Sequence, residues 1–399
     1  MAVPKRNAKG IMKFRTTRRD FIKTGVAGFC MLTPADLFAK SLLNLQKNEK
    51  RVIKNDAPRE LWKWSKEVYY KTEMGHGYVR CLTCPNMCVL PPDARSRCRS
   101  HVNKDGKLYT LVYGNPCAVH IDPIEKKPLY HFLPTSDTFS IATTGCSFHC
   151  LNCQNWEISQ AKPEDVRFHD LFPEAVIQKA VQTGCKSIAY TYSEATTFYE
   201  YMLDTSRLAG EKSIKNVWVT NGYINEPPLV EFSKTLDVAN VDVKSFSEST
   251  YASLNAGRLK PVLRTLNILK DKGVWFELTA LIVPTYTDDM EMIKKMCSWI
   301  LENLGADYPL HFSRFHPQYK LTHLPPTPIT FLKKARKTAM EMGIHYVYVG
   351  NIPPAETNHT FCPSCKKKII ERIGYRTDVK GVENGRCLFC EHPIAGFWG

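Results

Sequence analysis

The 399-residue sequence lacks any run of 18 or more apolar residues, which excludes an ordinary transmembrane helix. It also lacks an extreme composition, since 43% of its residues are apolar and 23% are charged. These values exclude disorder, collagen or a coiled coil as a description of the whole chain. No internal repeat is evident beyond a loose likeness between the terminal cysteine clusters. The length allows two or three globular domains of about 150 residues each.

The formal net charge of +15 is unevenly distributed along the chain. Residues 1–60 contain 14 Lys and Arg against 5 Asp and Glu, whereas the other 339 residues contain 40 against 34. Because most of the basicity lies in this short stretch, the charge does not indicate a nucleic-acid-binding body. The remaining small excess is typical of a solvated surface.

The basic stretch contains Arg18-Arg19, followed by Asp20-Phe21-Ile22 and a weakly apolar segment from Gly25 to Leu32. This order resembles a twin-arginine export signal, a route that carries folded proteins with their metal cofactors already inserted. We therefore expect residues 1–45 to be a leader that directs the protein to the periplasm or the membrane. The alternative is a basic tail on a cytoplasmic protein.

The middle of the chain alternates short apolar segments with amphipathic ones, which predicts a parallel sheet built from βα units. We expect a partial or full TIM-type (βα) barrel over residues 136–350, with chemistry at the C-terminal ends of its strands. A doubly wound sheet is the competing topology. A Cys-rich domain over residues 46–135, with a helix near Arg59–Tyr70, is expected before the barrel. The predicted strands are Thr138–Thr143, Ser187–Tyr192, Asn216–Asn221, Val238–Val243, Val274–Val283, Leu310–Phe315 and Ile344–Val349. The predicted helices are Pro173–Gln182, Thr196–Ala209, Pro227–Lys234, Pro261–Lys272, Asp288–Asn303 and Ile329–Met342.

Cys146, Cys150 and Cys153 directly follow the first predicted barrel strand, with C-x3-C-x2-C spacing. Three thiolates on one loop can ligate three irons of a cubane cluster and leave the fourth iron open to another ligand. A structural zinc site normally closes with four ligands, and an electron-transfer cubane normally has four thiolates. The spacing therefore predicts an open, catalytic cluster. A zinc site completed by His149 or a distant thiol is the alternative.

This motif resembles that of the radical S-adenosylmethionine (SAM) superfamily. The residues around it resemble the pyruvate formate-lyase-activating-enzyme-like branch and, within it, the AmmeMemoRadiSam system enzyme. The likeness extends from about Cys81 to the C-terminus, with one departure at Asn152, where the family often has an aromatic residue. The stretches that carry it are Asp122–Leu129, Cys153–Trp156, Tyr190–Glu194, Thr220–Tyr223, Val241–Lys244 and Tyr348–Asn351.

The resemblance implies a [4Fe–4S] cluster on the three cysteines, with SAM chelated to its open iron. Reductive cleavage of SAM would give methionine and a 5′-deoxyadenosyl radical, which abstracts hydrogen from a protein or a small organic substrate. It also implies a flavodoxin- or ferredoxin-like electron donor and separate Memo-like and AMMECR-like companion proteins. A glycyl-radical-enzyme activase is the alternative within the superfamily. A non-catalytic iron–sulfur or metal carrier is the alternative from another class.

Polar residues at the ends of successive predicted strands are candidates for holding SAM. The resemblance assigns Glu194 to the amino group of SAM, and Asp242 and Lys244 to its ribose hydroxyls and carboxylate. The alternatives are an exposed glutamate at a strand end and a plain buried salt bridge. Asn221 ends the third strand and is a candidate to face the ligand, with an ordinary strand-to-loop turn as the alternative. His316 near the sixth strand is a candidate to contact SAM or substrate, with a structural histidine as the alternative. A metal carrier needs no such pocket, so these residues favour the enzyme.

Two further sets of four cysteines flank the predicted barrel. The set in residues 351–399 pairs two C-x2-C knuckles, as zinc-ribbon or rubredoxin-like sites do, and predicts a closed structural site for zinc or iron. The earlier set is less regular and predicts a second metal site, for zinc or an auxiliary iron–sulfur centre. Disulfides are the alternative for an exported protein. The earlier set is Cys81, Cys84, Cys88 and Cys98, and the later set is Cys362, Cys365, Cys387 and Cys390.

Overall fold

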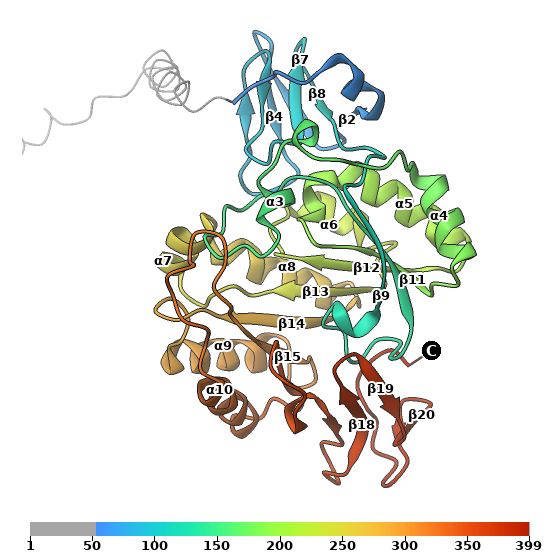
Figure 1. Cartoon of the computed structure of the whole chain (residues 1–399), viewed down its shortest axis with the longest axis vertical. Coiled ribbons are helices and arrows are strands. Elements are labelled where there is room, and N and C mark those ends of the chain that lie inside the picture. Colours follow the sequence, from blue (N-terminus) through green and yellow to red (C-terminus); the bar gives the residue numbers. More distant parts are fainter. Residues whose placement is uncertain (1–52, 399) are drawn as a thin grey trace, which may run out of the picture. The chain divides into compact units, whose positions relative to one another are not determined.

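The computed structural model describes residues 53–398 of the chain (Figure 1). The predicted leader, residues 1–45, lies outside the described residues, so its assignment stays a prediction. Among the helices of residues 53–398, none combines the length and the apolar character needed to cross a membrane.

The centre of the structure is an eight-stranded sheet in the order β16-β15-β14-β13-β12-β11-β10-β9. Seven strands are parallel, and β9 (Ala118–Pro123) pairs antiparallel with β10 at one edge. A doubly wound sheet reverses its strand order, whereas here each strand lies beside its neighbour in the chain. The predicted barrel topology is therefore confirmed, as a partial barrel with β9 and β16 at its edges. The parallel strands are β10 (Asp137–Ala142), β11 (Ser187–Tyr190), β12 (Lys215–Thr220), β13 (Val238–Asp242), β14 (Trp275–Ile282), β15 (Leu310–Arg314) and β16 (Val347–Gly350).

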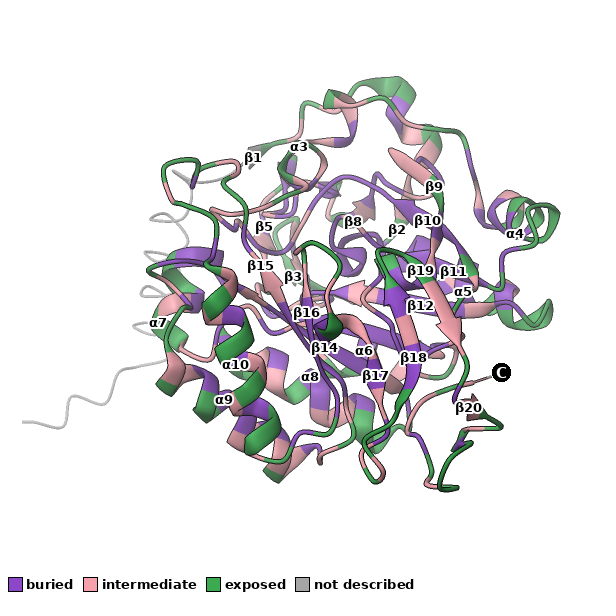
Figure 2. Cartoon of the chain, turned by 60° about the horizontal axis from the view of Figure 1, so that its bottom comes forward, coloured by how far each residue is buried: buried purple, intermediate pink, exposed green. Residues whose placement is uncertain are grey.

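Helices connect consecutive parallel strands and pack their apolar stripes against the outward face of the sheet. Val176 of α4 and Leu266 of α8 belong to the same buried cluster as Ile188 of β11 and Phe276 of β14. Figure 2 shows this packing as a pattern of burial. Strands of the central sheet are largely buried, whereas α9 and α10 alternate buried and exposed residues. The connecting helices are α4 (Pro173–Gln182), α5 (Tyr199–Glu211), α6 (Glu226–Phe232), α8 (Leu259–Asp271), α9 (Met290–Asn303) and α10 (Ile329–Glu341). All six match predicted helices to within a few residues.

The N-terminal end of the barrel is closed by buried side chains. Leu129 and Phe132 fill it together with Val217 and Val238 from the strands. Beside them, the Glu277 carboxylate accepts hydrogen bonds from the His131 amide at 2.7 Å and faces His311 Nε2 at 2.6 Å. Buried side chains and a hydrogen-bonded polar network thus fill the barrel interior at this end of the strands.

The N-terminal region forms two small antiparallel sheets. One has the order β1-β6-β7-β8-β2 and the other the order β3-β4-β5. The helix predicted over Arg59–Tyr70 is wrong beyond Trp64: a 3₁₀ helix, η1 (Arg59–Trp64), ends there and β2 (Lys66–Glu67) follows. The backbone amide of Val68 then bonds to Leu108, so sheet pairing replaces the local helical preference. The strands are β1 (Ile53–Lys54), β2 (Lys66–Glu67), β3 (Lys71–Gly75), β4 (Tyr78–Cys81), β5 (Val89–Leu90), β6 (Ala94–Arg95), β7 (His101–Lys104) and β8 (Lys107–Thr110).

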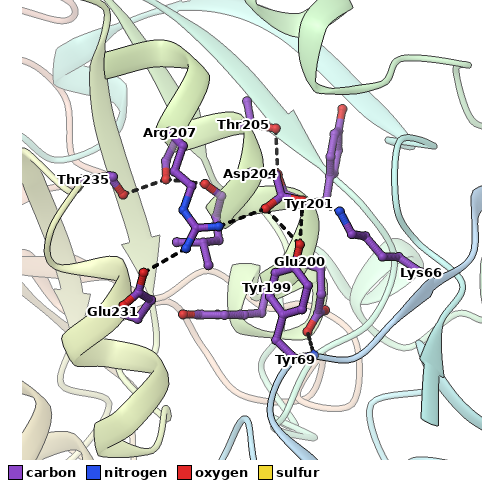
Figure 3. A network of polar contacts seen from close by, with 12 residues as sticks. Lys66, Tyr69, Tyr199, Glu200, Tyr201, Asp204, Thr205, Arg207, Glu231 and Thr235 are labelled. Atoms are coloured by element: carbon purple, nitrogen blue, oxygen red, sulfur yellow. Dashed lines mark hydrogen bonds and ion pairs between the residues drawn. The ribbon is translucent and has the colours of Figure 1, made fainter. Parts of the chain in front are cut away.

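A polar network joins this region to α5 of the barrel (Figure 3). Asp204 pairs with Lys66 Nζ at 2.5 Å and accepts a hydrogen bond from the Tyr69 hydroxyl at 2.8 Å. The backbone amide of Tyr69 donates to Glu200 at 3.0 Å, and burial raises the pKa of that carboxyl to about 7. These contacts fix the N-terminal sheets against the barrel, which places their cysteines.

The C-terminal region consists of short hairpins: β17 (Thr360–Phe361), β18 (Lys368–Ile373) and β19 (Arg376–Val379) form one sheet, and β20 (Val382–Glu383) pairs with β21 (Arg386–Cys387). Buried Arg372 donates to the Tyr130 carbonyl at 2.7 Å and lies 4.1 Å from the centre of the Tyr130 ring. The region thus covers the closed end of the barrel. The predicted domain limits of 46–135, 136–350 and 351–399 stay predictions, although β9 pairs with the barrel sheet from within the first range.

Candidate active site

The three-cysteine loop begins four residues after β10 ends, at the C-terminal edge of the sheet. Gly145 has a φ of +101°, a backbone conformation that glycine adopts readily, and its amide bonds to the Ile158 carbonyl at 3.0 Å. Phe148 is fully buried behind the loop, where its ring packs on Tyr223 and Tyr251. The loop is therefore anchored on both sides, with its thiols on an ordered backbone.

Amide groups from the loop itself and from other elements point at these thiols. The Asn255 side chain donates to Cys150 Sγ at 3.2 Å, the Asn221 side chain to Cys146 Sγ at 3.7 Å and the backbone amide of Phe148 to Cys146 Sγ at 3.4 Å. Burial raises the pKa of both thiols, so the thiolate form needs such donors or a bound metal. Amide donors around cysteine sulfurs are what an iron–sulfur cluster uses to stabilise its thiolates. The residues fit a cluster bound through Cys146, Cys150 and Cys153.

Asp242 ends β13, and Lys244, the second residue of the pair predicted to hold SAM, lies just after this strand. Lys244 Nζ lies 2.8 Å from Asp242 Oδ2, and the two side chains keep 24% and 33% of their surface exposed. Burial opposes the charge of Lys244, but Asp242 and the Cys150 thiol hold its pKa above the ordinary value. Lys244 in turn opposes the rise that burial causes in the pKa of Cys150 and Cys153. The salt bridge of the alternative is present, but it is partly accessible rather than buried, and Lys244 acts electrostatically on the cluster thiols. The contact of the pair with SAM stays a prediction.

Glu194 lies after β11 and is only 3% exposed, so the alternative of an exposed strand-end glutamate is wrong. Its Oε1 accepts hydrogen bonds from the Thr196 amide, the Thr196 hydroxyl and the Thr220 hydroxyl at 2.7–3.0 Å. Its Oε2 accepts one from the Asn221 amide at 2.8 Å. Burial raises the pKa of Glu194, and these donors oppose that rise. Glu194 thus joins the ends of β11 and β12 and positions Asn221 at the Cys146 thiol, while its contact with SAM stays a prediction.

Three other residues complete the description of this region. His316 is exposed after β15, where its Nε2 lies 3.3 Å from the Asn351 carbonyl, and none of the described hydrogen bonds joins it to the three-cysteine loop. Asn255 had no motif to mark it, because it ends the π-helix Tyr251–Asn255 and reaches Cys150 only through that turn. Asn152 has a buried Oδ1 without a hydrogen-bond partner within residues 53–398.

The flanking cysteines form two separate sets. At the C-terminal set, Cys362 Sγ lies 3.6 Å from Cys390 Sγ, and Cys365 Sγ lies 3.8 Å from Cys387 Sγ. All four sulfurs lie within 4.8 Å of one another, as four ligands of a single tetrahedral ion do. The N-terminal set lines one pocket with His101 and with residues next to Glu194. Those four cysteines are Cys81, Cys84, Cys88 and Cys98.

A three-thiol loop at the C-terminal edge of a partial (βα) barrel, surrounded by amides and a lysine–aspartate pair, fits the class of enzymes that bind an iron–sulfur cluster at this edge. Residues 140–299 match the family model for the radical SAM superfamily. The chain is also 42% identical over 331 residues to "Uncharacterized protein MJ0808" of Methanocaldococcus jannaschii, an alignment that covers 82% of this chain and 98% of that protein. The chain belongs to the radical SAM superfamily.

Solved structures of low sequence identity are also similar. A domain of pyruvate-formate lyase-activating enzyme from Bacteroides vulgatus is 10% identical, with a TM-score of 0.38, and covers 41% of this chain and 99% of its own. A radical SAM methyltransferase from Sphaerobacter thermophilus is 10% identical, with a TM-score of 0.44, and covers 74% of this chain and 82% of its own.

Proposed function

We propose that the protein cleaves SAM reductively and uses the resulting radical to abstract hydrogen from a substrate. The observation that carries this proposal is the convergence of Asn221, Lys244 and Asn255 on the thiols of the three-cysteine loop. When bound, the cluster and SAM supply the electron-driven bond cleavage that makes the 5′-deoxyadenosyl radical. The chain supplies binding, orientation and shielding.

Each of these residues has a role that follows from its position. The Lys244 ammonium group is partly exposed beside the thiols and would bind the carboxylate of SAM through a charge-assisted hydrogen bond. Asp242 presents a carboxylate acceptor to the ribose hydroxyls. Glu194 holds the chain so that Asn221 faces Cys146. Phe148 and Tyr251 are fully buried behind the loop and exclude water from the protein side of the cluster.

We place the protein with the AmmeMemoRadiSam enzymes on the strength of its motif stretches. On this basis we expect a low-potential electron donor of the flavodoxin or ferredoxin type and Memo-like and AMMECR-like companions. We further propose that the C-terminal cysteines hold a structural zinc ion, supported by their closed spacing. The Arg18-Arg19 motif supports export by the twin-arginine route, which replacement of both arginines by lysine would test through the distribution of the protein between cell fractions.

Production of 5′-deoxyadenosine tests the proposed function. Anaerobically reconstituted protein is incubated with SAM and dithionite, beside Cys150→Ala and Cys185→Ala variants. Cys185 is buried before β11, at the opposite end of the strands from the three-cysteine loop, and serves as the matched control. We expect product from the wild type and from Cys185→Ala but none above background from Cys150→Ala. Wild-type protein that carries a full cluster and yields no product would contradict the proposal.

A further inference from the structure

The four N-terminal cysteines come from three places in the chain and gather around one pocket. Cys81 ends β4, Cys84 and Cys88 lie in the turn before β5, and Cys98 lies in the turn before β7. All four line the same pocket, which is also lined by His101 and Thr197. Four thiols from a strand end and two turns in one pocket form a ligand set rather than four isolated core residues.

Buried polar atoms around this pocket point to a bound group. His101 is 2% exposed, and its Nδ1 lies 3.6 Å from Cys81 Sγ. Its Nε2 is buried and has no hydrogen-bond partner within the described residues. The Ser96 hydroxyl lies 3.0 Å from Cys98 Sγ. Because buried polar atoms normally have partners, the pocket is built for a polar or metallic occupant.

The N-terminal cysteine loops rest directly on the three-cysteine loop. The Asn86 side chain, between Cys84 and Cys88, donates to the Ser147 carbonyl at 2.8 Å. The Ser100 hydroxyl donates to the Thr144 carbonyl at 3.1 Å. A methyl group on Gly145 would lie only 2.6 Å from the Cys98 carbonyl oxygen, so the two backbones touch there. The two sets of thiols are therefore neighbours across a directly packed, hydrogen-bonded contact.

The spacing of the thiols separates this site from the C-terminal one. Within residues 53–398, the C-terminal set is the one that brings at least three such ligand atoms within 4.8 Å of one another. A single zinc ion needs that close spacing, because each sulfur lies about 2.3 Å from it. An iron–sulfur cluster spreads its thiolates farther apart, because several irons and sulfides lie between them. The described N-terminal set does not bring three ligand atoms this close together, which favours a cluster over a single zinc ion.

We propose that Cys81, Cys84, Cys88 and Cys98 bind an iron–sulfur cluster that passes electrons to the cluster of the three-cysteine loop. A low-potential one-electron donor protein reduces the N-terminal cluster by one electron, and this cluster is reoxidised as it reduces its neighbour. No covalent bond forms or breaks in the chain. His101 acts as a positioning residue through its contact with Cys81. The electron-transfer role rests on the proposed function, whereas the binding of the cluster does not.

Metal analysis of a chain without the catalytic cluster tests the site. The full-length variant Cys146→Ala/Cys150→Ala/Cys153→Ala is purified anaerobically, and its iron, sulfide and zinc are measured. We expect about four irons and four sulfides per chain. Adding Cys84→Ser and Cys88→Ser should remove the iron and leave the zinc of the C-terminal set, which also reports that the variant is folded. A triple variant with zinc in place of iron, or iron that survives the serine substitutions, would overturn the assignment.

Electron paramagnetic resonance of the reduced wild type tests the contact between the two clusters. We expect a broadened, fast-relaxing signal that neither the triple-alanine nor the Cys84→Ser/Cys88→Ser variant shows, because two reduced clusters so close together couple magnetically. A wild-type spectrum equal to the sum of the two variants would overturn the relay. Neither measurement depends on SAM cleavage, so failure of the proposed function and failure of this inference are distinguishable.

Discussion

The Asn86 side chain donates a hydrogen bond to the backbone carbonyl of Ser147 at 2.8 Å. This contact joins two cysteine loops that are some sixty residues apart in the chain, and it lies directly beside Cys146. The catalytic loop is thus held from two sides, by the strand ends of the barrel and by the N-terminal sheets. The predictions below test the parts of this arrangement separately.

Gly145 tests the contact between the two loops. In Gly145→Ala the new methyl group would lie 2.4 Å from the Ser100 hydroxyl oxygen, and the φ of +101° disfavours alanine. We expect the free energy of unfolding to fall by about 2 kcal/mol or more, measured by urea denaturation. Gly210→Ala in α5 is the control, since nothing lies within 4 Å of its added methyl group. Equal stabilities of the two variants would show that the loops do not pack as described.

Lys244 tests the binding of SAM. Lys244→Met keeps much of the side chain's volume but removes the charge beside the thiols and leaves Asp242 unpaired. We expect the Kd for SAM to rise roughly ten- to a hundredfold, the effect of losing a hydrogen bond to a charged group. Equilibrium dialysis at matched iron content measures this, with Lys260→Met on the exposed face of α8 as the control. An unchanged Kd would assign Lys244 a structural role.

The raised pKa of the buried Glu200 carboxyl predicts that the stability of the protein depends on pH. Burial raises its pKa from 4.5 to about 7 in the folded chain, so the folded state binds this proton more tightly than the unfolded state does. The contribution of this tighter proton binding to the free energy of unfolding is fully present below pH 4.5. It is lost as the pH rises through about 7. Glu200→Gln should therefore match the wild type near pH 4 and exceed it by up to about 3 kcal/mol above pH 7. Urea denaturation across this range measures the difference, with exposed Glu211→Gln as the control. A constant difference at all pH values would contradict the assignment.

The C-terminal cysteines predict a dependence of stability on zinc. Because Arg372 joins this region to Tyr130 at the closed end of the barrel, loss of the ion should loosen that end as well. We expect Cys362→Ser to lose one zinc per chain and to lower the thermal midpoint by roughly 5 °C or more. Cys185→Ala should keep the zinc. Full zinc content in Cys362→Ser would place the ion elsewhere.

Much of the fold follows from the sequence because local and tertiary preferences agree in the barrel. Every predicted barrel strand corresponds to an observed one, and α4 spans Pro173–Gln182 as predicted, with Pro173 at its first turn. The prediction of a helix over Arg59–Tyr70 is wrong after Trp64, where local and tertiary preferences no longer agree. There the pairing of β2 with β8 overrides the local preference for a helix. Periodicity gave the elements but not the topology, which required the observed strand order.

The candidate site was predictable where a motif or a strand end marks it, and not where a distant turn completes it. Cys146, Cys150 and Cys153 are found from spacing alone. The four hydrogen bonds that the buried Glu194 carboxylate accepts depend on the register of β11 and β12. The sequence therefore could not show that Glu194 positions Asn221. The contact of Asn255 with Cys150 depends on a π-helical turn that has no sequence signature.

The central claim is that the cluster on the three-cysteine loop keeps one iron open for SAM. Electron–nuclear double resonance of the reduced protein, with SAM that carries a nitrogen isotope label in its amino group, tests this most directly. The account predicts a coupling between the labelled nitrogen and the cluster in the wild type and in Cys185→Ala. A protein with a full cluster at Cys146, Cys150 and Cys153 and with SAM bound, yet without this coupling, would contradict it.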